Sequence, residues 1–367
     1  MDVYHSIKNE KTIGVIHEDS VNKVMEIAYP YGVIAAITPT TTHTSTAMYK
    51  TLIALKAGNA IVVSPHPRAK RWTVETLKSC HEAAIKAGAP EGLIGWISEP
   101  SMEATQQLMT HRDVDLILST GGGGLVRAAC SSGKPAYGVG PGNVPVYIEK
   151  SCDVKKAVKM IVDSKTFDNG TICATEQAIV VDQSIKEQVA SEMERNGAYF
   201  LNAEEKRKLE RLILPAGNGR VSPDIVGKPA VKIAEMAGVK VPDGTRLLVA
   251  EENQAGKDVP FSLEKLAPIF ALYTVANEQD ALNRCLDILN LGGRGHSFAI
   301  HTQDDRVVRT FSEKMPVSRV LVNTLSSIGA VGATTALETS MTLGCGAYGG
   351  NISSDNITAR HLYNVKR

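Results

Sequence analysis

Cys173 is the residue whose type and surroundings best suit nucleophilic catalysis. It lies in the segment TFDNGTICATE (166–176), a polar, glycine-bearing loop between an expected helix and an expected strand. A thiol in such a loop predicts a nucleophile, with an unreactive loop thiol as the alternative. Cys345, within TLGCGAYGG, competes with it, although its glycine neighbours also suit a plain tight turn. Three other cysteines lie inside helical patterns, where cysteine packs as a small hydrophobic residue: Cys80, Cys130 and Cys285.

A glycine run at 121–124 follows an expected strand and opens an expected helix. Glycine lets the backbone approach a phosphate or nicotinamide closely, and a helix N-terminus offers unpaired N–H groups. The run departs from the GxGxxG fingerprint, because Arg127 occupies the third glycine position. It predicts nucleotide contacts at Thr120, Gly121 and Gly122, with a purely structural turn as the alternative.

A second candidate contact is the segment SPHPRAKR (64–71), expected where another strand ends. Its imidazole and basic side chains are of the type that meets ribose or phosphate oxygens, and a basic loop turned by two prolines is the alternative. Glu264 in SLEKLAP and His296 in GGRGHS follow turn-prone segments and precede expected strands. A single glutamate or histidine is usually solvated or structurally bonded, so neither is selected by its own surroundings.

The chain has 367 residues, of which 43% are hydrophobic, and a formal net charge of +1. This length predicts two packed domains, and the balanced charge argues against nucleic acid or a membrane surface as a partner. Its start lacks the apolar run of a secretory signal, and no stretch reaches the ~18 apolar residues of a membrane span, so we expect a cytoplasmic protein. Six cysteines are too few for a disulfide scaffold, and none has the spacing of zinc ligands, so no metal site is expected.

The elements that must position these residues alternate along the chain. Residues 12 to about 29 predict a hairpin, and from residue 32 short apolar strands alternate with helical patterns that end at Gly58 and Gly88. A second such series begins near residue 150 and contains the Cys173 loop. This βα alternation predicts two α/β domains with parallel sheets, one for a cofactor and one for catalysis.

Taken together, the motifs resemble one family. FDNGTICATEQ, GGGG, SPHPRAKR, EKLAP and TLGCGAYGGN occur in this chain and, in corresponding order, in CoA-acylating aldehyde dehydrogenases. From about residue 7 to its end, the chain resembles the aldehyde dehydrogenase half of bifunctional aldehyde-alcohol dehydrogenases. Several spaced motifs are far more specific than any single glycine loop.

The resemblance implies the α/β aldehyde dehydrogenase fold, with a Rossmann-like NAD domain, an α/β catalytic domain and an oligomerisation hairpin. We expect an N-terminal remnant with the hairpin at 1–29, the NAD domain at 30–148, the catalytic domain at 149–340, and a C-terminal tail at 341–367 that packs on the NAD or hairpin region. The family has a sizeable segment ahead of the hairpin, so the NAD domain is expected to be incomplete at its N-terminus. A homodimer or homotetramer is expected.

By the same resemblance, Cys173 matches the catalytic cysteine. Its thiolate would add to the aldehyde carbon, hydride would pass to NAD, and the thiol of CoA would attack the remaining thioester to release acyl-CoA. Glu264 matches the glutamate that holds the nicotinamide ribose. The full set of expected cofactor contacts is Ser64, His66, Pro67, Arg68, Thr120, Gly121, Gly122, Gly140 and Glu264.

Two departures from the family pattern bear on the reaction. Hydrolytic aldehyde dehydrogenases carry a general-base glutamate in an ELGGK motif, whereas YGVGPGNVP (137–145) has no acidic residue. Water would lack its base, and a thiol such as CoA needs less help, which agrees with acyl transfer. Acylating enzymes usually read TPTTNPTS where this chain reads TPTTTHTS (38–45). The expected catalytic partners here are Thr41 and Thr42, and the expected substrate contacts are Thr40, His43 and His296.

The exchange at Thr42 and His43 bears on the substrate. Hydroxyls donate without carrying charge, and a histidine can become cationic beside an anion, which favours an anionic aldehyde such as sulfoacetaldehyde or succinate semialdehyde. Acetaldehyde or propionaldehyde remains the first expectation, with His43 then capping a helix or facing solvent. Two further functions stay open, a hydrolytic aldehyde dehydrogenase and a truncated, catalytically silent assembly subunit. Association with a bacterial microcompartment shell is an alternative to the open cytoplasm.

Overall fold

The protein divides into two compact units in a computed structural model that describes residues 3–215 and 220–367. The first unit runs to Gly140 and includes Ala336–Arg367, and the second comprises Pro141–Thr335. Residues 1 and 2, with which the expected N-terminal part begins, lie outside the described residues. None of the helices within the described ranges has both the length and the apolar character that crossing a membrane requires.

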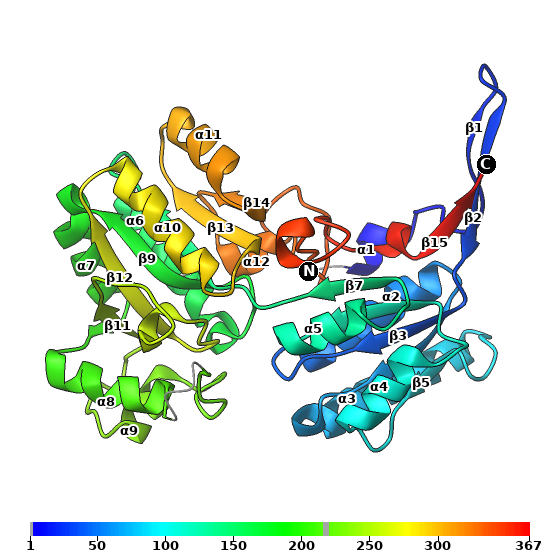
Figure 1. Ribbon diagram of the computed structural model, residues 1–367, viewed down its shortest axis with the longest axis horizontal. Helices are drawn as coiled ribbons and strands as arrows, with labels where there is room; N and C mark the ends of the chain where they lie inside the picture. The colour runs from blue at the N-terminus through cyan, green and yellow to red at the C-terminus, as the bar shows by residue number, and fades with distance from the viewer. Residues whose placement is uncertain (1–2, 216–219) are drawn as a thin grey trace. The chain divides into compact units, whose positions relative to one another are not determined.

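A parallel five-stranded sheet forms the centre of the first unit, in the order β5-β4-β3-β6-β7 (Figure 1). Ile34, Ile61 and Leu118 are fully buried on it, because helices cover a parallel sheet on its faces. Gly58 and Gly88 end α2 and α3 with φ of 79° and 89°, the left-handed conformation expected of helix-stop glycines. The elements are β3 (Val33–Ile37), α2 (His43–Lys56), β4 (Ala60–Ser64), α3 (Lys70–Lys86), β5 (Ile94–Trp96), α4 (Met102–Thr110), β6 (Leu116–Thr120), α5 (Gly123–Cys130) and β7 (Ala136–Val139).

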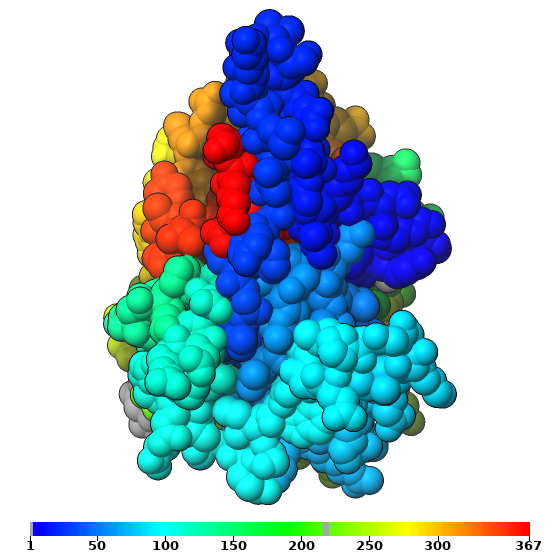
Figure 2. Space-filling model, turned by 90° about the vertical axis from the view of Figure 1, so that its right-hand side faces the viewer, coloured from blue at the N-terminus to red at the C-terminus, as the bar shows by residue number. Residues whose placement is uncertain are grey.

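The expected hairpin is present. After the short helix α1 (Val3–Ile7), β1 (Gly14–Asp19) and β2 (Val24–Pro30) pair antiparallel around a turn in which Lys23 has a φ of 55°. The last strand of the chain, β15 (Tyr363–Lys366), pairs antiparallel with β2, and Figure 2 shows this red segment lying along the blue hairpin. The result is a three-stranded sheet with the order β1-β2-β15.

The C-terminal segment returns to the first unit through buried polar contacts. Tyr49 donates its hydroxyl to the Ile357 carbonyl at 2.6 Å, and the Asn59 side chain donates to the Leu362 carbonyl at 2.7 Å. The Asn351 side chain accepts from the Gly138 N–H at 2.7 Å. These hydrogen bonds join residues more than two hundred positions apart, which is why the unit contains both ends of the chain.

The second unit contains a seven-stranded parallel sheet in the order β10-β11-β12-β9-β8-β13-β14. Its central strand β9 is buried at every position, because helices cover both faces. The strands are β8 (Val144–Ile148), β9 (Glu176–Asp182), β10 (Ala198–Phe200), β11 (Leu247–Glu251), β12 (Ile269–Val275), β13 (Gly295–His301) and β14 (Val317–Val322). The helices are α6 (Val154–Thr166), α7 (Lys186–Arg195), α8 (Ala203–Ile213), α9 (Ala230–Met236), α10 (Glu278–Asn290), α11 (Asp305–Lys314) and α12 (Ser326–Ala330).

The α/β class and the parallel sheets are confirmed, and the unit boundaries differ from the expected ones. The sequence places the first boundary at 148 and the second at 340, whereas the units part at 140 and 335. The reason for the first difference is β8, which pairs with β9 and β13 in the second sheet. The charged sequence between 184 and 212 is typical of helices, and the structure adds the short strand β10 between α7 and α8.

The hairpin generates a prediction about assembly. Val15, on the edge strand β1, and Met25, on the middle strand β2, are 42% and 46% exposed. A monomer would therefore leave both an open strand edge and apolar side chains in water. We expect light scattering at micromolar concentration to give a dimer or tetramer mass for the wild type. The double variant Val15→Lys, Met25→Lys should shift towards monomer, because a lysine on the edge strand β1 opposes strand pairing and a charge on β2 opposes apolar packing between copies.

The matched control for this experiment is Ile85→Lys. Ile85 is 37% exposed on α3, outside the hairpin, and its replacement should leave the oligomer mass unchanged. A monomeric wild type would contradict the prediction, and so would an unchanged mass in the double hairpin variant.

Candidate active site

Local backbone geometry positions Cys173. Helix α6 ends at Thr166, and the next turn contains Asp168, Asn169 and Gly170 with φ of 48°, 51° and 75°. Two consecutive non-glycine residues in this region are strained and persist only where the surroundings hold them. Thr171 donates to the Asp168 carboxylate at 2.6 Å, and Asn169 donates to the Gly227 carbonyl at 3.0 Å. The turn therefore delivers Cys173, half-buried, just ahead of β9.

Four residues from separate parts of the chain meet at the amino-terminal edge of the seven-stranded sheet. Gly142 precedes β8, Cys173 precedes β9, Glu264 precedes β12, and His296 is the second residue of β13. Because all strands of this sheet are parallel, the residues that lead into them gather on the same edge. The sequence prediction included three of these residues, and it missed Gly142.

Gly142 contacts each of the other three residues. A Cβ at this position would collide with the Cys173 carbonyl oxygen and would lie 2.9 Å from the His296 ring. Its N–H donates to the Glu264 carboxylate at 2.8 Å. Only glycine allows so close an approach, so no side chain can be added here without moving the thiol loop or the imidazole. In the sequence, its signal is the glycine-rich stretch GVGPGN, which does not reveal the contact.

His296 faces the thiol. Its Nε2 lies 3.1 Å from the Cys173 Sγ, and its Nδ1 lies 3.0 Å from the Ser297 hydroxyl. Burial and the positive charge of Arg319 lower the pKa of His296 to about 3, so the imidazole is neutral at neutral pH. A neutral imidazole that donates from Nδ1 presents a lone pair at Nε2. The pair is therefore arranged for a proton to leave a thiol toward His296.

Glu264 is surrounded by buried charges. Burial raises its pKa to about 7, although the Gly142 N–H and the charges of Lys165 and Lys265 favour the ionised form. Lys265 is fully buried, and its ammonium donates to the Phe261 and Leu263 carbonyls at 2.6 and 2.7 Å, which closes the turn that carries Glu264. The sequence did not predict a role for Lys165 or Lys265, because a lysine side chain is normally exposed to solvent.

The expected cofactor loops of the first unit share one edge of its sheet. Residues 38–42 follow β3, Ser64 ends β4, and Thr120 ends β6, all at carboxyl ends of parallel strands. In chain order, this sheet has the arrangement 3-2-1-4-5 of a doubly wound nucleotide-binding sheet, in which ligands bind outside the carboxyl ends.

The details of this edge suit a dinucleotide. Thr120 Oγ1 is buried without a hydrogen-bond partner among the described residues, and a Cβ at Gly122, Gly123 or Gly124 would meet no described atom within 4 Å. The start of α5 is therefore open to a ligand, and these residues fit a nicotinamide dinucleotide, the class of cofactor that the fold implies. Ser64 is less available, because its buried hydroxyl lies 2.8 Å from that of Thr105.

The remaining expected residues are placed as follows. The His66 side chain accepts from the Arg68 N–H at 3.2 Å, and Pro67 and Arg68 are exposed beside it. Gly140 is the last residue of the first unit before the chain crosses to the second. His43 begins α2 and donates from Nδ1 to the Thr40 carbonyl at 2.8 Å, so its side chain does not cap a helix N–H. Thr40, Thr41 and Thr42 are half-buried in the loop before it.

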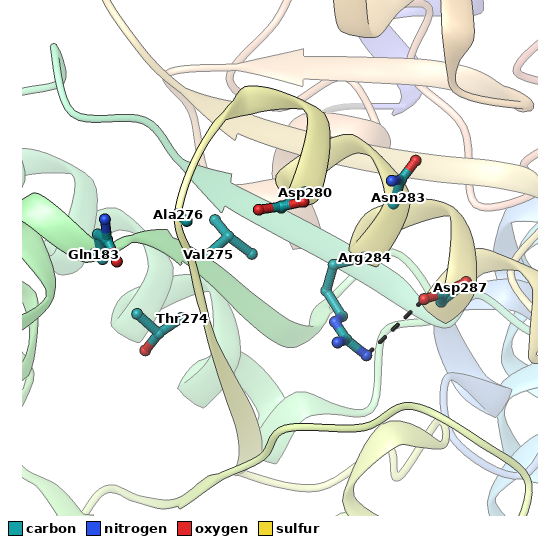
Figure 3. A pocket seen from close by; sticks show the side chains of 8 residues that line it. All are labelled: Gln183, Thr274, Val275, Ala276, Asp280, Asn283, Arg284 and Asp287. Carbon is teal, nitrogen blue, oxygen red and sulfur yellow. Dashed lines mark ion pairs between the residues drawn. The ribbon is translucent and has the colours of Figure 1, made fainter.

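Other features of the second unit lie apart from this cluster. A cavity of about 400 Å³ opens between the carboxyl end of β12 and one side of α10 (Figure 3). None of the expected site residues lines it. Its guanidinium, Arg284, is already engaged by Asp287 at 4.0 Å and by the Asn253 carbonyl at 2.9 Å. Within the described parts of the chain, His, Cys, Asp and Glu side chains nowhere form a group of three or more that could hold a metal ion. Cys345 is buried, 2% exposed, in the first unit.

Comparison with known proteins places the chain in a family. The family model for the aldehyde dehydrogenase family matches residues 3–199. The acetylating succinate-semialdehyde dehydrogenase of Clostridium kluyveri is 36% identical over 365 residues, which cover 100% of this chain and 80% of that protein. The chain belongs to the aldehyde dehydrogenase family.

Solved and curated members of this family extend the similarity over the whole chain. The crystal structure of an acetylating aldehyde dehydrogenase from Geobacillus thermoglucosidasius superposes with a TM-score of 0.97 and 53% identity, covering 100% of this chain and 80% of that one. The bifunctional aldehyde-alcohol dehydrogenase of Escherichia coli K12 is 46% identical over 369 residues, 99% of this chain. The chain spans 41% of the length of that curated relative.

The raised pKa of Glu264 predicts how stability depends on pH. The pKa of Glu264 is about 7 in the folded protein, against 4.5 for an unperturbed glutamate in the unfolded chain. Between pH 5 and 7 the folded state therefore holds a proton that the unfolded state has released. Stability contributed by this proton is lost as the pH rises through 7. The variant Glu264→Gln lacks this proton. Its free energy of unfolding should exceed that of the wild type by a larger margin at pH 8 than at pH 5, and the two margins should differ by up to about 3 kcal/mol. Urea unfolding at the two pH values measures this difference, and a difference independent of pH would contradict the prediction.

Proposed function

We propose that this chain catalyses CoA-acylating oxidation of a short-chain aldehyde with NAD. The observation that carries the proposal is the approach of the Cys173 thiol to a neutral imidazole at 3.1 Å, at the end of a strained loop. Such a pair suits a thiol nucleophile whose proton must move as a bond to sulfur forms. The acetylating relatives that match this chain over its whole length support the proposal.

The first step forms a bond between the Cys173 sulfur and the aldehyde carbon. The thiol proton moves to His296 Nε2 while Nδ1 donates to the Ser297 hydroxyl. The carbonyl electron pair moves to oxygen and gives a thiohemiacetal. Because the pKa of His296 in the free protein is about 3, its imidazolium readily gives the proton up. The proton passes to the alkoxide oxygen and completes the thiohemiacetal.

The second half of the reaction transfers the acyl group. NAD, when bound, would supply the acceptor for the hydride of the thiohemiacetal carbon. The hydroxyl proton would be released at the same time, and a thioester would remain on Cys173. The CoA thiol then attacks this thioester and its proton goes to His296 Nε2. Sulfur of Cys173 leaves as thiolate and recovers the proton. Glu264 would hold the nicotinamide ribose, and Thr41 and Thr42 remain the further proposed catalytic residues.

Hydrolysis is the less favoured alternative. No carboxylate lies in residues 137–145, where hydrolytic relatives carry their general base. Glu176, three positions after Cys173, is fully buried and already accepts two hydrogen bonds. A neutral imidazole with a low pKa activates a thiol more readily than water, because a thiol is far more acidic.

Another relative supports the acyl transfer. A crystal structure of Rhodopseudomonas palustris propionaldehyde dehydrogenase, 28% identical with a TM-score of 0.87, contains bound CoA and an acylated cysteine. We propose the same class of intermediate for Cys173. The proposal further includes a homo-oligomer in the cytoplasm, with a microcompartment as the alternative location.

A CoA-dependence assay tests the proposal. We expect NADH formation from acetaldehyde or propionaldehyde that requires CoA and yields acyl-CoA by mass spectrometry. Cys173→Ser should abolish it, because a serine hydroxyl is too weakly acidic to replace the thiol. Cys345→Ser, the matched control, should keep most of the activity, because that thiol is buried in the first unit.

Each other outcome of this assay points to a different function. NADH formation that does not need CoA and yields a carboxylate would establish the hydrolytic reaction instead. Absence of NADH formation with every aldehyde would favour a silent assembly subunit. Full activity of Cys173→Ser would contradict the proposed mechanism.

His43 generates a prediction about the aldehyde. Its Nδ1 is occupied by the Thr40 carbonyl, which orients the ring and leaves Nε2 for a ligand. A sulfoacetaldehyde dehydrogenase of Acholeplasma is 38% identical over 369 residues. This relative and the succinate-semialdehyde dehydrogenase are both named for anionic aldehydes, which supports an anionic substrate as the alternative. If it applies here, His43→Ala should raise KM for succinate semialdehyde about tenfold, the loss expected for one charge-assisted hydrogen bond.

The matched substrate is butyraldehyde, which has the same number of carbons and a methyl group in place of the carboxylate. Its KM should change less than twofold in His43→Ala. Equal changes for the two aldehydes, or no activity with any charged aldehyde, would exclude the anionic substrate and leave acetaldehyde or propionaldehyde.

A further inference from the structure

Glu176 is a buried carboxylate that the proposed reaction does not use. It opens β9 three residues after Cys173 and is 0% exposed. Burial raises its pKa to about 7, which shows that the ionised form is costly at this position. A buried acid of this kind is kept only where its oxygens are needed, because an apolar residue of similar volume is usually as stable or more so.

The two carboxylate oxygens of Glu176 hold two different helices. One oxygen accepts from the Ser164 hydroxyl on α6 at 2.6 Å. The other accepts from the backbone N–H of Ser326, the first residue of α12, at 3.1 Å. Ser164 in turn accepts from the Ser327 N–H at 2.9 Å, so α6 and α12 are joined directly as well. Only a carboxylate offers an acceptor to both donors, since an amide has one oxygen and a competing NH₂ group.

This cluster connects to the catalytic loop through Ser326. The Ser326 hydroxyl donates to the carbonyl of Ala174, the residue after Cys173, at 2.7 Å. One peptide earlier, the Cys173 carbonyl lies so close to Gly142 that no Cβ would fit there. The two peptides that follow the Cys173 side chain are therefore held in place, the first by Gly142 and the second by α12.

We propose that Glu176 is a positioning residue that fixes the amino end of α12 and, through the Ser326 hydroxyl, holds the Cys173 thiol in line with His296 Nε2. This inference rests on the proposed function of Cys173. It adds to that function a cluster of α6, β9 and α12 residues, Ser164, Glu176, Ser326 and Ser327, whose role is orientation of the nucleophile. Lys165, which donates to the Glu176 carbonyl at 2.7 Å, supplies the nearby positive charge.

The chain provides a matched control in Glu149. This glutamate is also buried, at 5% exposed, and its carboxylate also accepts hydrogen bonds from hydroxyl and N–H donors. They are the Ser151 N–H and the hydroxyls of Ser151 and Thr302. It follows β8 at the carboxyl edge of the same sheet, whereas Glu176 and Cys173 lie at the amino edge. Loss of either carboxylate disturbs a buried cluster, but only the Glu176 cluster is bonded to the thiol loop.

The experiment compares Glu176→Gln with Glu149→Gln in the full chain. Alkylation of Cys173 by iodoacetamide, followed by peptide mass spectrometry at pH 7, needs neither cofactor nor substrate. We expect the alkylation rate in Glu176→Gln to fall about tenfold, because a displaced thiol loses its proton acceptor. We also expect kcat to fall at least tenfold with KM for NAD within twofold, and Glu149→Gln to leave both quantities within twofold of wild type.

A third variant separates positioning from folding. Ser326→Ala removes only the bond to Ala174 and keeps the carboxylate, so it should lower alkylation and kcat in the same direction. The double variant Ser326→Ala, Glu176→Gln should be no slower than Glu176→Gln, because both act through one connection. If Glu176→Gln does not fold, Ser326→Ala alone decides the question.

Two results would overturn the inference. One is alkylation and kcat within twofold of wild type in Glu176→Gln and Ser326→Ala, and the other is an equal loss in Glu149→Gln. If the wild type oxidises no aldehyde, the proposed function fails, whereas the alkylation rates still report whether Glu176 positions the thiol.

Discussion

The close approach of the Gly142 backbone to three other segments is the constraint on which the site in the second unit depends. Its N–H binds the Glu264 carboxylate, and its Cα faces the Cys173 carbonyl and the His296 ring without room for a side chain. Because β8 begins two residues after Gly142, the position of this glycine is set by the pairing of β8 with β9 and β13 on either side. The strands that bring the loops together thus also determine how near the loops can come.

Burial at this edge sets the charge state of the groups that surround the thiol. It lowers the pKa of His296 to about 3 and that of Lys165 to about 7, and it raises the pKa of Glu264 to about 7. Near neutral pH the site therefore contains a neutral base beside a thiol, instead of a permanent ion pair. Proton movements in such surroundings are coupled to bond formation at sulfur, since isolated charges are poorly solvated there.

The two units use opposite edges of their parallel sheets. In the first unit the candidate cofactor loops follow β3, β4 and β6, so they lie at carboxyl ends, where doubly wound sheets bind ligands. In the second unit the thiol, the imidazole and Glu264 precede their strands or begin them, so they lie at amino ends. At the carboxyl edge of this second sheet lies the cavity beside α10, which none of the candidate residues lines.

Local patterns in the sequence determined the α/β alternation, the hairpin, the two helix-stop glycines and the loop that carries Cys173, because each depends on neighbours within a few positions. The three-residue strand β10 escaped prediction, since it is too short to show a period. Tertiary structure alone decided the partner of the thiol, because His296 is 123 positions away and comes near only through the order of the strands. It also decided the roles of Gly142, Lys265 and Glu176. A glycine is essential only where another backbone approaches it, and a charged side chain is buried only where distant segments supply its hydrogen-bond partners.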